Sequence, residues 1–188
     1  MRAFIAIDLP QEIKSQLAKI QKHLASSNAD AKWVEPENIH LTLKFLGEIT
    51  PEQQNQITAI LKEIGATYST FPAQITSLGA FPKIDHPRII WVGIEQGDQE
   101  IKTIVQKLEE ELEKIGIPQE SREFASHITL ARVRSGKNRM ELVNGLNNLL
   151  GKLQVAEFKV GKITLFKSTL SHQGPLYQPL GEIILQTA

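Results

Sequence analysis

The sequence predicts an α+β fold built as a bilobal, pseudo-symmetric duplication. Two antiparallel-rich sheets face a central groove, and the helices cover the outer faces of the sheets. Three observations lead to this prediction. Short apolar runs typical of strands alternate with longer segments whose apolar residues recur at helical spacing. The order strand, helix, strand, helix, strand is predicted in both halves of the chain. Each half also contains one tetrapeptide of the pattern His-aliphatic-Thr-Leu, at residues 40–43 and 127–130.

The first half begins with a predicted buried strand at residues 4–7, followed after Pro10 by a helix with apolar residues at positions 13, 17, 20 and 24. A strand at residues 39–46 contains the first tetrapeptide. Thr50 and Pro51 are typical of a helix N-cap and first helical position, so a second helix is expected to begin there. A strand at residues 71–78 completes this half.

The second half begins with a strand at residues 88–94, which we expect to form a hairpin with the preceding strand. A helix follows, with an apolar stripe from Ile101 to Ile115, and Gly116 and Pro118 end it. The glutamates at positions 109, 110, 111 and 113 indicate a solvated helix face rather than a site. Then come the strand of the second tetrapeptide, a weaker helix at residues 140–150, and strands near residues 156–166 and 181–185.

Length and composition restrict the possible functions. At 188 residues the chain is expected to form a single two-lobed domain spanning residues 1–188. Lys plus Arg equals Asp plus Glu at 21 each, which excludes the large positive excess of proteins that bind long nucleic acid regardless of sequence. With no cysteine there is no disulfide or thiolate metal site. No apolar run approaches the ~18 residues of a membrane span, so we expect a cytoplasmic protein without a membrane partner. We also expect a monomer.

The two tetrapeptides carry the chemistry. Because side chains alternate along a strand, His40 and Thr42 project from one face, and His127 and Thr129 do the same in the second copy. If the two strands lie about a pseudo-twofold axis, two imidazoles face each other with two hydroxyls between them. Imidazoles titrate near neutrality, so one can act as base while the other acts as acid. This set of groups suits a phosphodiester, whose cleavage needs a base, an acid and donors to the phosphate oxygens.

Other interpretations stay open for these residues. One such tetrapeptide alone would more often be an ordinary strand, but two copies in apolar strands favour a site. A metal bound by the two histidines is the competing chemical reading. Metals usually require a third or fourth ligand, and neither tetrapeptide contains a carboxylate, so no metal site is predicted.

Residues beside the tetrapeptides are weaker candidates. Strict alternation places Lys44 on the face of His40, where it could neutralise phosphate, although a solvated lysine is an equal alternative. The same alternation places Arg132 on the face opposite His127, so Arg132 reaches the groove only if the strand twists or ends there. The histidines at positions 23, 86 and 172 are expected on the surface.

The sequence resembles the two-histidine phosphoesterases, specifically the RNA 2′,3′-cyclic phosphodiesterases once called 2′-5′ RNA ligases. Besides both tetrapeptides, the similarity includes residues 2–10, 33–34, 39–48, 81–82, 87–93, 131–133, 165–168 and 174–177. One departure is Ser126, before the second histidine, where proline is frequent in the family.

The resemblance implies a bilobal α+β enzyme without a cofactor, acting on RNA ends or small cyclic nucleotides. It implies hydrolysis of a 2′,3′-cyclic phosphate to the 2′-phosphomonoester, with weak 2′-5′ ligation as a possible reverse activity. By motif position, His40 would be the proton donor to the 3′ oxygen and His127 the proton acceptor from water. Thr42, Thr129 and Arg132 would bind the phosphate. The alternative is a module that binds an RNA end or nucleotide without turnover.

Overall fold

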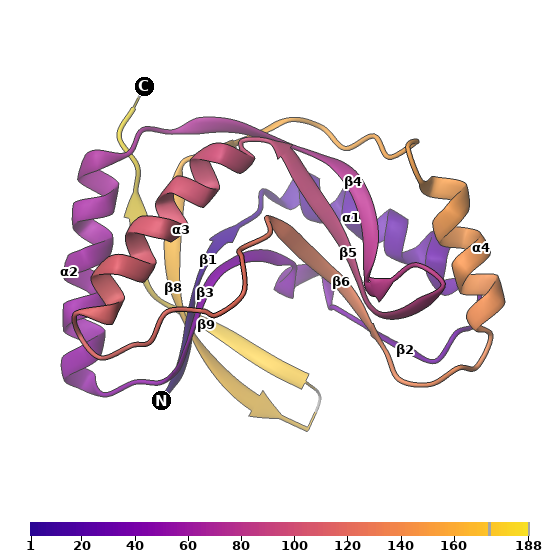
Figure 1. The fold of residues 1–188 in the computed structure, drawn as a ribbon, viewed down its shortest axis with the longest axis horizontal. Helices are drawn as coiled ribbons and strands as arrows, with labels where there is room; N and C mark the ends of the chain where they lie inside the picture. Colours follow the sequence, from indigo (N-terminus) through magenta and orange to yellow (C-terminus); the bar gives the residue numbers. More distant parts are fainter. Residues whose placement is uncertain (173, 188) are drawn as a thin grey trace.

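The computed structural model describes residues 1–172 and 174–187, and its helices and strands follow the predicted α+β order (Figure 1). The elements of the first half are β1 (Arg2–Asp8), α1 (Gln11–Ala25), β2 (Ala31–Trp33), the short 3₁₀ helix η1 (Pro36–Asn38), β3 (His40–Glu48), α2 (Pro51–Thr67) and β4 (Phe71–Lys83). Those of the second half are β5 (His86–Gln96), α3 (Asp98–Glu113), β6 (His127–Val133), α4 (Arg139–Leu149), β7 (Phe158–Val160), β8 (Lys162–Ser171) and β9 (Gly174–Ile184).

The strands form two antiparallel sheets, as predicted. The first has the order β3-β1-β8-β9 and the second the order β2-β6-β5-β4-β7. Each sheet therefore combines strands from both halves of the chain. Helices α2 and α3 pack on the first sheet, against β8, β9 and β3, whereas α1 and α4 pack on the second, against β6 and β4 (Figure 1).

The helices begin and bury their stripes where the sequence indicates. Thr50 caps α2 through a capping box: its hydroxyl accepts from the Gln53 backbone N–H at 3.1 Å, and the Gln53 side chain accepts from the Thr50 N–H at 3.1 Å. The predicted stripes of α1 and α3 are buried in one apolar cluster that takes residues from both sheets.

A second, smaller apolar cluster covers the other face of the first sheet. It comprises Phe4, Ala6 and Phe166, with Tyr177 of β9 packed against them. Strand β1 is therefore buried on both faces, with Ile5 and Ile7 pointing to the main core and Phe4 and Ala6 to this cluster.

Three strand predictions differ from the structure. The strand expected at residues 156–166 is divided at Gly161, so β7 joins β4 in one sheet and β8 joins β1 in the other. Strand β9 begins at Gly174 rather than 181, because its prolines at 175 and 179 conceal the pattern and an edge strand tolerates them. The short edge strand β2 was not predicted, since three residues carry too little pattern.

Candidate active site

Both tetrapeptides occupy the start of a strand, His40 as the first residue of β3 and His127 as the first of β6. In each, the histidine and threonine are partly exposed, while the aliphatic residues at the second and fourth positions are buried. The predicted alternation within each tetrapeptide is confirmed.

A β-bulge follows at the same position in both strands. Opposite β1, Thr42 pairs with Ala6 but Lys44 pairs with Ile5, so Leu43 has no partner residue. Opposite β5, Thr129 pairs with Trp91 but Ala131 pairs with Ile90, so Leu130 is the extra residue. An extra residue reverses the alternation that follows it, and it does so at the fourth residue of both motifs.

The first bulge corrects the prediction for Lys44. Its side chain turns away from the face of His40, and the residue is buried. The ammonium donates to Oε2 of Glu109 in α3 at 2.7 Å and to the Pro118 carbonyl at 2.8 Å. Lys44 is therefore a buried structural cation, and Glu109 is its partner rather than part of a solvated face. Phe45 takes the place that alternation assigned to Lys44 and is exposed.

The second bulge has the opposite effect on Arg132. Because the alternation of side chains reverses at Leu130, Arg132 lies on the same face as His127 and Thr129, opposite Ile89 of β5. Strict alternation had placed it on the other face, which was wrong. Burial raises the pKa of the Tyr177 phenol, and the positive charges of Arg132 and Arg2 oppose that shift. Arg132 of one sheet therefore lies near Tyr177 of the other.

His40 is held in a defined orientation. Its Nδ1 lies 2.6 Å from the Asn38 carbonyl oxygen, which can only accept, so Nδ1 carries the hydrogen. Its Nε2 lies 2.9 Å from the Thr42 hydroxyl. The ring packs against Phe4 at 4.9 Å and meets Tyr177 edge-on at 5.3 Å between centroids. Burial lowers the pKa of His40 below 6.5, while the Asn38 hydrogen bond and the Asp8 carboxylate act in the opposite direction and Lys14 lowers it further.

His127 repeats this arrangement. Its Nδ1 lies 2.8 Å from the carbonyl oxygen of Ala125, again the residue two positions before the histidine. Its ring meets Phe81 edge-on at 5.3 Å and Trp91 at 6.4 Å between centroids. Both histidines therefore point Nδ1 at their own backbone, which leaves Nε2 as the nitrogen that can exchange a proton with a ligand.

The two motif strands belong to different sheets but touch each other, β3 against β6. Tyr177 connects the two sides, because its ring contacts His40 and its phenol lies near Arg132. The Asn38 side chain also donates to the Pro175 carbonyl at 3.1 Å, which ties the segment before His40 to β9. These contacts bring the His40 side of the first sheet next to the His127 face of the second.

Comparison with known families agrees with this arrangement. The family model described as "LigT like Phosphoesterase" matches residues 7–91 and again residues 92–177. Each match contains one of the two histidine motifs. The chain belongs to the LigT-like phosphoesterase family. Because the same model matches both halves, this chain contains two copies of the family's unit.

Relatives of similar length agree with the family assignment. An RNA 2′,3′-cyclic phosphodiesterase of Aeropyrum pernix is 36% identical, over 89% of this chain and 94% of the relative. One of Aquifex aeolicus is 33% identical, over 98% and 97%. Among solved structures, TT0787 of Thermus thermophilus superimposes with a TM-score of 0.82 at 26% identity, over 100% and 99% of the chains. E. coli LigT complexed with 3′-AMP gives 0.77 at 25%, over 98% and 97%.

Carboxylates near the LigT-like motifs have other partners. The Asp8 carboxylate, opposite His40 on β1, pairs with Lys14 at 2.7 Å. Across residues 1–172 and 174–187, no three or more histidine, aspartate or glutamate side chains are grouped in a way that could hold a metal ion. The histidines at positions 23, 86 and 172 are exposed, as expected. No helix of the described residues is long and apolar enough to cross a membrane.

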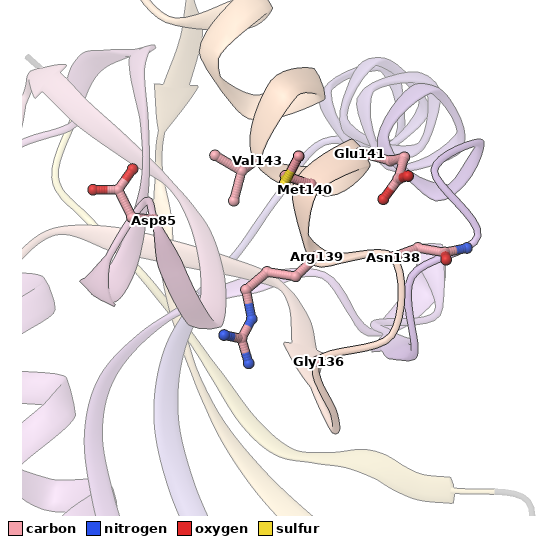
Figure 2. A pocket seen from close by; sticks show the side chains of 7 residues that line it. All are labelled: Asp85, Gly136, Asn138, Arg139, Met140, Glu141 and Val143. Atoms are coloured by element: carbon pink, nitrogen blue, oxygen red, sulfur yellow. The ribbon is translucent and has the colours of Figure 1, made fainter.

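One surface depression lies away from the two motifs. It measures about 560 Å³ and is formed by the β4–β5 turn and the start of α4, with Asp85, Arg139 and Met140 among its lining residues (Figure 2). No motif residue lines it, so its size does not make it the reaction site.

Sequence reasoning missed the residues that orient the histidines. Tyr177 and Phe4 pack on the His40 ring, and Phe81 and Trp91 flank the His127 ring. The carbonyls of Asn38 and Ala125 carry no side-chain signal at all. One signal was present: the two tetrapeptides agree in residue class up to the fourth position and diverge after it, where the bulges lie.

Proposed function

We propose that this chain hydrolyses the 2′,3′-cyclic phosphate of an RNA end or nucleotide to a 2′-phosphomonoester. The observation that carries the proposal is the repeated histidine geometry. On two touching strands, each Nδ1 donates to a backbone carbonyl and each Nε2 is directed away from it. The relatives named RNA 2′,3′-cyclic phosphodiesterase, at 33–36% identity over most of the chain, support the same reaction.

The reaction uses both imidazoles in one step. Neutral His127 takes a proton from water at Nε2 while the water oxygen bonds to phosphorus. The bond between phosphorus and the 3′ oxygen breaks, and that oxygen takes a proton from Nε2 of protonated His40. The products are a 3′ hydroxyl and a 2′-phosphate. Thr42, Thr129 and Arg132 bind the non-bridging phosphate oxygens, which gain charge in the transition state.

The acid role of His40 depends on bound substrate. Without substrate, burial lowers the pKa of His40 and favours its neutral form. A bound phosphate places negative charge beside the ring, which raises this pKa and favours the protonated form. The Thr42 hydroxyl, now on Nε2 of His40, is then free to donate to a phosphate oxygen instead.

Turnover separates this proposal from a binding module. We expect the protein to convert many molar equivalents of a nucleoside 2′,3′-cyclic phosphate. Chromatography of the reaction mixture measures the product. A binding module would saturate at one equivalent and release the substrate unchanged, and that result would refute the proposal. We further propose that the chain needs no cofactor, acts as a cytoplasmic monomer forming one domain over residues 1–188, and catalyses 2′-5′ ligation only weakly.

A further inference from the structure

Three arginines surround a surface depression where β6 ends. The depression measures about 260 Å³ and is lined by Arg88 of β5, Arg134 just after β6 and Arg139 at the start of α4. All three side chains are exposed. Arg134 and Arg139 belong to the basic segment 132–139, and the fold brings Arg88 of β5 beside them.

These arginines have no acidic partner. In the part of the chain that the structure describes, side-chain ion pairs involve lysines, and none involves an arginine. Asp85 and Glu141 line the neighbouring depression, and Figure 2 shows Arg139 extended away from Glu141. The chain has no net charge, and many of its glutamates lie on α3, at the opposite end of the molecule from α4 (Figure 1).

One lining residue, Arg134, continues the face of β6 that carries the second motif. His127, Thr129 and Arg132 share that face, and Arg134 follows two residues later, where its N–H donates to the Asp30 carbonyl at 2.8 Å. At about 3.3 Å per strand residue, Arg134 lies roughly 20 Å from His127. A stacked nucleic-acid strand advances about 3.4 Å per nucleotide, so this distance corresponds to roughly six nucleotides.

We propose that Arg88, Arg134 and Arg139 bind backbone phosphates of the RNA on the 5′ side of its terminal cyclic phosphate. This inference rests on the proposed function, since it names the part of that substrate which lies beyond the reacting group. Arginine suits the role because its planar guanidinium donates two parallel hydrogen bonds to a phosphate and stays charged. A mononucleotide cannot reach this site, so the site distinguishes an RNA end from a free cyclic nucleotide.

The test compares a long ligand with a short substrate. The double variant Arg88→Gln with Arg134→Gln removes two charges, and it spares Arg139, whose guanidinium lies beside Gly136. The matched control is Lys19→Gln with Lys62→Gln, two exposed lysines on α1 and α2. Affinity is measured by fluorescence anisotropy with an RNA octanucleotide that ends in a 2′-phosphate. Turnover is measured with cytidine 2′,3′-cyclic phosphate.

The arginine variant should bind the octanucleotide at least about tenfold more weakly than the wild type at 50 mM salt, because two charged hydrogen bonds are lost. Raising salt from 50 to 200 mM should weaken the wild type about sevenfold more than this variant, since two phosphate contacts change the single-strand salt slope by about 1.4. The control should stay within about twofold of wild type. Turnover of the cyclic mononucleotide should be unchanged in both variants.

If the arginine variant binds the octanucleotide with the affinity and the salt dependence of the wild type, the inference is overturned. An equal loss in mononucleotide turnover would also overturn it, because the arginines would then act on the reaction site or the fold. If the wild type turns over neither the cyclic mononucleotide nor an RNA octanucleotide that ends in a 2′,3′-cyclic phosphate, the proposed function is refuted, and the anisotropy comparison still decides whether these arginines bind RNA.

Discussion

Replacing Lys44 with methionine tests the bulge in β3, because the two possible positions of this side chain predict opposite results. In the structure, the Lys44 side chain is 1% exposed and pairs with Glu109, whose side chain is 15% exposed. Lys44→Met leaves the Glu109 carboxylate without its cation, and the Pro118 carbonyl loses a donor. Had alternation held, Lys44 would face the phosphate site, and its loss would impair catalysis instead.

The structure sets the size of the effect. Removing one partner of a buried ion pair typically costs about 3–5 kcal/mol. Glu109 also accepts from the Glu120 N–H at 3.2 Å, so we expect the low end, about 3 kcal/mol. In a chain of this length that corresponds to a fall in Tm of roughly 6–12 °C.

The assay measures both properties on the same samples. Thermal unfolding gives the Tm, and turnover of a cyclic mononucleotide well below that temperature gives kcat/KM, which should stay within about twofold of wild type. Lys44→Met with Glu109→Leu should recover most of the Tm, because it replaces both charges with apolar groups. Exposed Lys62→Met is the control, with little change expected. A large loss of kcat/KM at an unchanged Tm would refute the buried position of Lys44.

Four further predictions concern the reaction site. Thr42→Ala or Thr129→Ala should each lower kcat by about 10–10³-fold, the typical effect of losing one hydrogen-bond donor to a charged oxygen. Unchanged steady-state kinetics in either variant would show that its threonine does not bind the phosphate. Arg132→Gln should lower kcat/KM for the cyclic mononucleotide by about tenfold or more through loss of a charged hydrogen bond, whereas unchanged kinetics would place Arg132 outside phosphate contact. Activity should survive EDTA and dialysis, and a loss restored by one divalent ion would indicate a metallohydrolase. Since burial lowers the His40 pKa below 6.5 in the folded protein, the unfolded chain gains this proton first as pH falls. The contribution of His40 to the free energy of unfolding should therefore be present above pH 6.5 and decrease below it. In chemical denaturation, the free energy of unfolding of the wild type should fall relative to that of His40→Gln as the pH is lowered from 7.5 to 5.5. A difference between the two proteins that does not change with pH would contradict the lowered pKa of His40.

The sequence predicts each histidine–threonine pair correctly because alternation is a local property. Four consecutive residues of alternating burial are enough to place His40 with Thr42 and His127 with Thr129. The same rule fails one residue later. A bulge depends on how the neighbouring strand pairs, and β1 and β5 are far away in the sequence. Lys44 and Arg132 therefore exchange their expected faces, and nothing local to either residue shows it.

Sheet membership is a second property that local patterns do not contain. The two similar halves suggest one lobe per half, but β8 of the second half pairs with β1 of the first, and β2 of the first half pairs with β6 of the second. Tyr177 and His40 come together only because β9 completes the sheet that contains β3. Their contact depends on this long-range pairing and could not be predicted from either segment alone.

The most direct test of the paired-histidine mechanism is the opening of cytidine 2′,3′-cyclic phosphate at saturating substrate by wild type, His40→Ala and His127→Ala, with chromatographic identification of the product. We expect the wild type to form the 2′-phosphate alone, because a fixed acid and base place only one ester oxygen in line with water. Each variant should retain its fold, shown by its Tm, and lose about 10²–10⁴-fold in kcat. Near wild-type turnover by either folded variant would contradict the mechanism, and a dominant 3′-phosphate from the wild type would contradict the assigned roles of His40 and His127.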